Sequence, residues 1–155
     1  MVRYTSFTYL IVVVFSILIG CRQEQTMEEQ MDTKHTVCYM AISQSDTAWL
    51  KIDTSGKQIK GLLNFSYANA KKFEGQFKGT INGDTLKGHY DFKVNKVDKW
   101  YRNPVAFLKR DNKLTMGLGE ISMVWGSAFF DDKVPIDYQK GRFVFEQTNC
   151  SNAAK

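Results

Sequence analysis

Apolar and polar residues alternate along three successive segments between residues 59 and 94. The first segment places Ile59, Gly61, Leu63, Phe65 and Tyr67 on one face. The same period of two recurs over residues 73–82 and 85–94. Because successive side chains of a β-strand point to opposite faces, this period predicts strands with one dry and one wet face. Such strands are typical of an antiparallel sheet that covers a core on one side, whereas parallel strands in α/β folds are apolar on both faces.

Short turn sequences separate the predicted strands. Asn82-Gly83-Asp84 lies between the second and third segments, and Gly and Asn tolerate the positive φ that tight hairpins need. Short connections between consecutive strands predict a meander. We expect about eight strands, with a short additional strand as an option near 122–125 and irregular structure over 126–140. The expected strands are 36–42, 46–52, 58–67, 73–82, 85–94, 104–110, 113–120 and 142–148.

A meander of this size has two exposed edges, which closing the sheet removes. We therefore predict an all-β fold, a single antiparallel barrel over residues 36–150, with a two-sheet sandwich as the alternative. Glycines at 61, 75, 79 and 88 fall on the apolar face. There a missing side chain permits strong bending or leaves room for a bulky neighbour.

The N-terminal segment has a different pattern, in which Arg3 precedes an apolar run that ends in Gly20 and Cys21. This predicts a secretory signal peptide over 1–20. The stretch Leu18-Ile19-Gly20-Cys21 resembles the lipobox of bacterial lipoproteins, which implies that Cys21 carries acyl chains such as palmitate and anchors the protein to a membrane. An ordinary cleaved leader and a transmembrane helix are the alternatives, although the run is about half of the ~20 residues that span a bilayer.

The remaining segments follow from composition. Residues 21–35 are polar and are expected to form a flexible tether, with a short helix as the alternative, and 151–155 form a tail. Arg22 is not an obvious inner-membrane retention signal, so we expect the outer membrane. From Lys57 to Lys113 there are 13 Lys and Arg against 5 Asp and Glu. This basic half faces either phosphate-bearing lipid, an acidic polymer or only solvent; nucleic acid is not expected as a partner of an exported protein.

Three cysteines occur in the chain, and lipid on Cys21 leaves Cys38 and Cys150. An even pair in an oxidising compartment predicts a disulfide, which would stabilise a loop of this length by about 4–5 kcal/mol. Two buried free thiols, or pairing with a partner, are the alternatives. Because the first and last strands of a barrel are neighbours, the bridge and the barrel support each other. With only His35 and His89 and no C-x-x-C spacing, we expect no metal site and no cofactor.

Several of these residues together resemble a known group of proteins. They are Cys38-Tyr39, Gly83-Asp84-Thr85-Leu86-x-Gly88-x-Tyr90-x-Phe92, Gly117-x-Gly119-Glu120 and the terminal Cys150. This order is similar to that of small envelope lipoproteins of Gram-negative bacteria, over most of residues 36–150. The resemblance implies secretion, lipidation and a lipocalin-like β meander, and it carries no assigned activity. Members usually have an acidic, serine-containing stretch where this chain has residues 97–104.

No catalytic constellation stands out, and we expect no enzyme. His89 lies on a predicted wet face, and adjacent Asp131 and Asp132 are expected to solvate a loop. Two functions remain for what we expect to be a monomer. An interaction module would bind an envelope protein or polysaccharide through exposed aromatic residues, which are Trp49, Trp100 and Tyr101. A lipocalin-like carrier would hold a small apolar ligand against inward-facing rings, or these rings fill the core; they are Phe65, Tyr67, Phe77, Tyr90 and Phe92.

Overall fold

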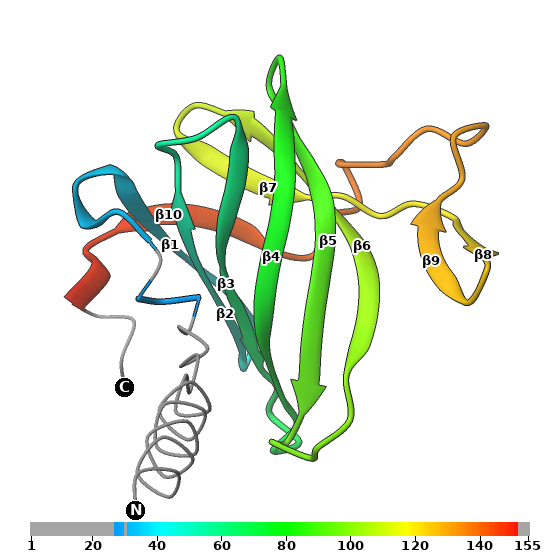
Figure 1. Cartoon of the computed structure of the whole chain (residues 1–155), viewed down its shortest axis with the longest axis horizontal. Helices are drawn as coiled ribbons and strands as arrows, with labels where there is room; N and C mark the ends of the chain where they lie inside the picture. The colour runs from blue at the N-terminus through cyan, green and yellow to red at the C-terminus, as the bar shows by residue number, and fades with distance from the viewer. Residues whose placement is uncertain (1–26, 30, 152–155) are drawn as a thin grey trace, which may run out of the picture.

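The computed structural model describes residues 27–29 and 31–151 of the 155-residue chain. Within them the fold is a closed barrel of eight antiparallel strands, with a separate two-stranded hairpin at its side (Figure 1). The predicted signal peptide and the predicted lipidation site at Cys21 lie outside the described residues, as does most of the tail. Among the described residues, no helix is long and apolar enough to cross a membrane.

The strand order confirms the predicted all-β barrel over the predicted sandwich. Around the barrel the order is β1-β10-β7-β6-β5-β4-β3-β2, so strands β1 to β7 pair with their neighbours in the chain and β10 closes the sheet between β7 and β1. The barrel strands are β1 (Thr36–Ser43), β2 (Asp46–Asp53), β3 (Gln58–Ser66), β4 (Lys72–Asn82), β5 (Thr85–Val94), β6 (Tyr101–Arg110), β7 (Lys113–Met116) and β10 (Val144–Thr148).

The prediction was wrong for residues 117–120 and for the second strand of a hairpin that follows, whereas the optional short strand near 122–125 corresponds to the first strand of that hairpin. Strand β7 ends at Met116 rather than continuing to residue 120, and the chain then forms a hairpin of β8 (Ile121–Val124) and β9 (Ser127–Phe130). The hairpin turns at Trp125 and Gly126, whose φ angles of 51° and 78° lie in the left-handed region. The sequence Ile121–Phe130 does not alternate regularly between apolar and polar residues, so no period of two indicated β9 within the stretch that was expected to be irregular.

The hairpin forms a second layer on the outside of the barrel. Strand β9 packs on β6, and Pro104 and Ala106 on the outward side of β6 are buried, as are Ala128 and Phe130 of β9. This explains why residues 104–108 of the expected strand are all apolar. Strand β6 is therefore buried on both faces where the hairpin covers it. The strand begins at Tyr101, three residues before the predicted start at residue 104.

Close contact between strands accounts for two of the glycines on the apolar face. A Cβ added to Gly75 would lie 2.0 Å from the carbonyl oxygen of Asp91, and one added to Gly88 would lie 2.1 Å from that of Lys78. Neither site has room for any side chain, so the backbones of β4 and β5 approach each other as only glycine permits.

A disulfide joins Cys38 of β1 to Cys150, with 5.2 Å between the two Cα atoms, as predicted. Cys38 is opposite Thr148 of β10 in the strand register. The bridge therefore fastens the end of the chain beside the seam where the last strand meets the first. All eight barrel strands and both cysteines lie between residues 36 and 150.

The described part of the predicted tether packs against the barrel instead of forming a free coil. Met27 and Met31 are buried, and Glu28 forms an ion pair with Lys51 of β2 at 2.8 Å. The backbone N–H of Asp32 donates a hydrogen bond to the Asp53 carboxylate at 2.9 Å, ahead of a single 3-10 turn over Thr33–His35. The two methionines give this polar stretch an apolar contact that its composition concealed.

Candidate functional site: a cavity at the barrel mouth

Strand register decides which loops surround each end of the barrel. Residues 44–45, 67–71 and 95–100 connect strands at one end, which we call the mouth, and the segment 141–143 enters β10 there. The connections 54–57, 83–84 and 111–112 lie at the other end, where β1 also begins. Strand β7 ends at Met116, opposite Phe107, so the mouth half of β6 has no full strand beside it.

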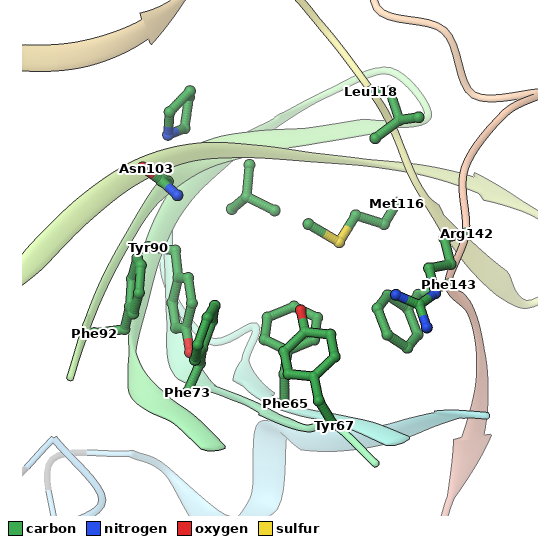
Figure 2. Close-up of a pocket in the computed structure, with 12 residues that line it drawn as sticks. Phe65, Tyr67, Phe73, Tyr90, Phe92, Asn103, Met116, Leu118, Arg142 and Phe143 are labelled. Atoms are coloured by element: carbon green, nitrogen blue, oxygen red, sulfur yellow. The ribbon is translucent and has the colours of Figure 1, made fainter. Parts of the chain in front are cut away.

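An apolar cavity of about 260 Å³ lies at the mouth, against this incomplete part of the wall (Figure 2). Rings from three neighbouring strands and from the segment before β10 form most of its lining. The lining rings are those of Phe65, Tyr67, Phe73, Tyr90, Phe92 and Phe143. Val105, Met116 and Leu118 close the side where β7 ends, and Asn103 and Arg142 supply polar groups.

Four of the five predicted inward rings, those of residues 65, 67, 90 and 92, line this cavity. Phe77 does not, because it lies four positions beyond Phe73 on β4, which is about 13 Å deeper along the strand. It is fully buried and meets Phe107 edge to face at 5.9 Å, and Phe107 in turn meets Phe145 at 5.5 Å. The barrel is thus filled by rings at its centre and hollow at its mouth.

The lining rings hold one another in place. Tyr90 and Phe92 are stacked with 4.7 Å between centroids, and Phe73 stacks on Phe92 at 5.2 Å. Phe65 meets Tyr90 edge to face at 5.8 Å and Phe143 at 5.3 Å. Ring pairs of this kind contribute about 0.5–1.5 kcal/mol each beyond their area burial. The wall is therefore organised before any ligand enters.

Tyr90 introduces a polar atom into this wall. The residue is 4% exposed, and its hydroxyl has no hydrogen-bond partner among the described residues. Burial raises the pKa of the Tyr90 hydroxyl far above its ordinary value, so the group is neutral at physiological pH. A buried donor without a partner costs about 1–3 kcal/mol.

Arg142 stands at the rim of the cavity, where sequence analysis did not place a functional residue. Its guanidinium forms an ion pair with the nearly buried carboxylate of Asp46 and lies over the rings of Tyr67 and Phe143, at 5.8 and 5.3 Å from their centroids. Asp46 also accepts a hydrogen bond from the backbone N–H of Ala68 at 2.8 Å. Ninety-six positions separate the ion-paired residues, so no local pattern could reveal the contact.

The predicted surface aromatics do not form one patch. Trp49 is half-buried on β2. Across the sheet it is followed in register by Asn64 of β3, Glu74 of β4 and Lys93 of β5, so three strand spacings separate it from Lys93. Trp100 and Tyr101, by contrast, lie together at the mouth and are 55% and 41% exposed. The Tyr101 ring stacks on Phe92 of the cavity wall at 5.6 Å.

His89 borders a second, more open cleft of about 700 Å³ between the barrel wall and the β8–β9 hairpin. Its ring meets Phe129 edge to face at 5.4 Å, and its Nδ1 has no hydrogen-bond partner among the described residues. Asp131 and Asp132 line the same cleft, and Asp132 forms an ion pair with Lys87 at 3.3 Å. Within the described ranges, no group of three or more His, Cys, Asp or Glu residues could hold a metal ion.

No family model, curated protein or solved structure matches this chain.

Proposed function

We propose that this protein is a non-catalytic binding module of the cell envelope that holds a small, flat, apolar ligand in the cavity at the barrel mouth. The observation that carries the proposal is a hollow, ring-lined space in a barrel whose centre is otherwise filled. Ligand sites of this kind occur in the mouths of β-barrels and are mostly apolar with a few polar groups.

The size of the cavity narrows the class of ligand. An apolar cavity of ~150 Å³ binds benzene, whereas sites for drug-sized ligands begin near ~300 Å³. A volume of about 260 Å³ therefore suits two fused rings or a short branched chain. The stacked rings of Tyr90 and Phe92 favour the flat ligand, because an aromatic ligand can stack on them in turn.

The proposed location rests on the N-terminal sequence. Arg3, the apolar run and the lipobox-like stretch before Cys21 support export, cleavage and lipid attachment, in the outer membrane by preference. The Cys38–Cys150 disulfide agrees with an oxidising compartment. We propose that acyl chains on Cys21 anchor the module while the barrel presents its cavity.

Naphthalene tests the ligand site directly. The mature chain, residues 21–155 with Cys21→Ser, is titrated with naphthalene and followed by two-dimensional NMR of aromatic and methyl groups. We expect saturable shifts of Met116 and of the lining rings at micromolar to millimolar ligand. Met116 is half-buried and lines the cavity, so the larger side chain of Met116→Trp should fill the space and abolish binding.

Met123→Trp is the matched control, because Met123 is 66% exposed on the hairpin and does not line the cavity. This variant should bind naphthalene as the unchanged protein does. If naphthalene binds Met116→Trp with undiminished affinity, or if shifts appear around His89 instead of Met116, the cavity is not the ligand site.

A further inference from the structure

The loops at the barrel mouth carry lysines that no acidic group neutralises. Lys71, Lys72, Lys96 and Lys99 are all exposed, and none of them forms an ion pair within the described residues. Two of them lie in or next to the loop 67–71 and two in the loop 95–100. They form a cationic rim around the opening of the cavity.

The acidic groups near the mouth already have other partners. Asp98 pairs with Lys93 at 2.6 Å, Asp91 with Arg102 at 2.5 Å, and Asp46 with Arg142. Glu74 is the remaining carboxylate of strands β4 and β5. It is half-buried on the outer wall of β4 and lies opposite Lys93 in register. The mouth therefore has a net positive charge.

Two hydrogen bonds hold the loops 67–71 and 95–100 together. The N–H of Lys72 donates to Asn95 Oδ1 at 2.7 Å, and the N–H of Asn95 donates to the carbonyl of Lys72 at 2.8 Å. Asn95 and Lys96 have φ angles of 50° and 61°, and the N–H of Val97 closes a tight turn onto the carbonyl of Val94 at 3.0 Å. Asn95 and Lys96 are therefore the central residues of this turn, and Val97 follows them directly.

Apolar and aromatic side chains stand among these lysines. Val97 is 61% exposed and Trp100 is 55% exposed, at two points of the same loop. The Nζ of Lys93 lies 4.9 Å from the Trp100 ring centroid, and that of Lys99 lies 5.1 Å from the Tyr101 centroid. Trp and Tyr are enriched where apolar and wet surroundings meet, and lysine clusters are attracted to anionic lipid headgroups.

We propose that the mouth of the barrel docks onto an anionic lipid surface, with Val97 and Trp100 entering the headgroup layer and the four lysines on lipid phosphates. The composition favours lipid over protein, because protein interfaces are depleted of lysine. It also favours lipid over polysaccharide, because the Lys93 ammonium already lies over one of the two faces of the Trp100 ring that a sugar could stack on. In this orientation the cavity opens toward the bilayer surface.

The N-terminal segment is long enough for the lipid anchor and the barrel mouth to contact the same membrane. Glu28 contacts Lys51, which is five positions along β2 from Asp46 at the mouth, or about 16 Å. Cys21 lies seven positions before Glu28, a distance of at most about 24 Å in an extended chain. Lipid on Cys21 could therefore enter the bilayer that the mouth contacts.

Vesicle binding tests the proposal without the anchor. The mature chain with Cys21→Ser keeps the whole barrel and its disulfide, and it is floated with vesicles of phosphatidylethanolamine and phosphatidylglycerol, or of phosphatidylcholine alone. Binding to the anionic vesicles should exceed binding to the neutral ones at least tenfold and should weaken in 0.5 M salt, since each lysine near such a surface contributes roughly fivefold.

A charge-matched pair of variants locates the surface. One variant changes the four lysines of the cationic rim to Gln; the control changes four lysines elsewhere, Lys34, Lys57, Lys60 and Lys109, and so has the same net charge. The rim variant should lose binding at least tenfold and the control at most twofold. Equal losses, or no preference for anionic vesicles in the unchanged protein, would overturn the proposal.

Tryptophan emission identifies the side chain that enters the lipid. Trp49→Phe with Trp125→Phe leaves Trp100 as the reporter, and Trp49→Phe with Trp100→Phe leaves Trp125, which is fully exposed on the hairpin. Brominated lipid should quench Trp100 and leave Trp125 unchanged. Quenching of Trp125 alone would assign the lipid contact to the hairpin and refute docking through the mouth. Naphthalene binding to the rim variant, measured separately, should be unchanged.

Discussion

Replacing Tyr90 by phenylalanine should stabilise the protein, although it removes a polar group from a well-packed wall. The Tyr90 ring contacts Phe65 and Phe92, and phenylalanine would keep both contacts. The hydroxyl has no partner among the described residues, so its desolvation is uncompensated in the folded state. Removing it recovers part of the about 1–3 kcal/mol that an unsatisfied buried group costs, less the small contact loss of one oxygen. We expect Tyr90→Phe to gain about 1 kcal/mol, or about 4 °C in Tm.

The same substitution should change the response to alkaline pH. Burial raises the pKa of Tyr90 in the folded protein, whereas in the unfolded chain the phenol ionises near its ordinary value of ~10. Stability from this residue is therefore fully present below pH ~10 and is lost as the pH rises above it, by up to about 1.4 kcal/mol per unit. Phenylalanine cannot ionise, so the advantage of the variant should widen between pH ~10 and ~11.

Guanidinium unfolding with the disulfide intact, followed by tryptophan emission at neutral and alkaline pH, measures both effects. Tyr101→Phe is the control, because Tyr101 is 41% exposed and water can satisfy its hydroxyl, so this variant should unfold within about 0.5 kcal/mol of the unchanged protein. If Tyr90→Phe destabilises the protein by ~1 kcal/mol or more, or if its advantage does not vary with pH, the hydroxyl has a partner and the reasoning is wrong.

Two further predictions concern the backbone. Cys38→Ser with Cys150→Ser should lower the free energy of unfolding by about 4–5 kcal/mol, because the bridge spans a sequence separation of 112, and the reduced protein should match the variant in the same guanidinium titration. Gly75→Ala should destabilise the protein by about 3 kcal/mol or more, because the added Cβ would collide with the Asp91 carbonyl. Gly56→Ala is the control: its added Cβ would lie 3.5 Å from the nearest atom, so the variant should unfold within about 0.5 kcal/mol of the unchanged protein. Similar unfolding midpoints for the two alanine variants would contradict the close approach of β4 and β5.

Local periodicity was sufficient for most of the barrel and for four rings of the candidate site. A period of two in the sequence indicates strands with one apolar face. The same period places the rings at 65, 67, 90 and 92 on the inward face. A short strand near 122–125 was an option, but β9 and its packing on Pro104 and Ala106 of β6 were missed. A contact between distant segments leaves no period of two in either segment. Arg142 was missed for a similar reason, since its position depends on Asp46 at the other end of the chain.

The depth of Phe77 shows a second limit of sequence reasoning. Its place on the inward face was predicted, but whether an inward ring lines a space or fills one depends on how the opposite wall closes. Strand β7 ends at Met116, and this early end leaves the mouth open while Phe107 and Phe145 fill the centre. No residue near Phe77 encodes that difference.

The position of β10 has a consequence for the order of assembly. Because the last strand lies between β7 and β1, a nascent chain that lacks residues 144–148 keeps a slot with two unpaired borders. Such borders are templates for pairing with other chains, and contacts so far apart in sequence form slowly. Cys150 follows that strand in the sequence, so the disulfide cannot form before the residues of β10 have been synthesised. Emerging chains would therefore need shielding until residues 144–148 have emerged.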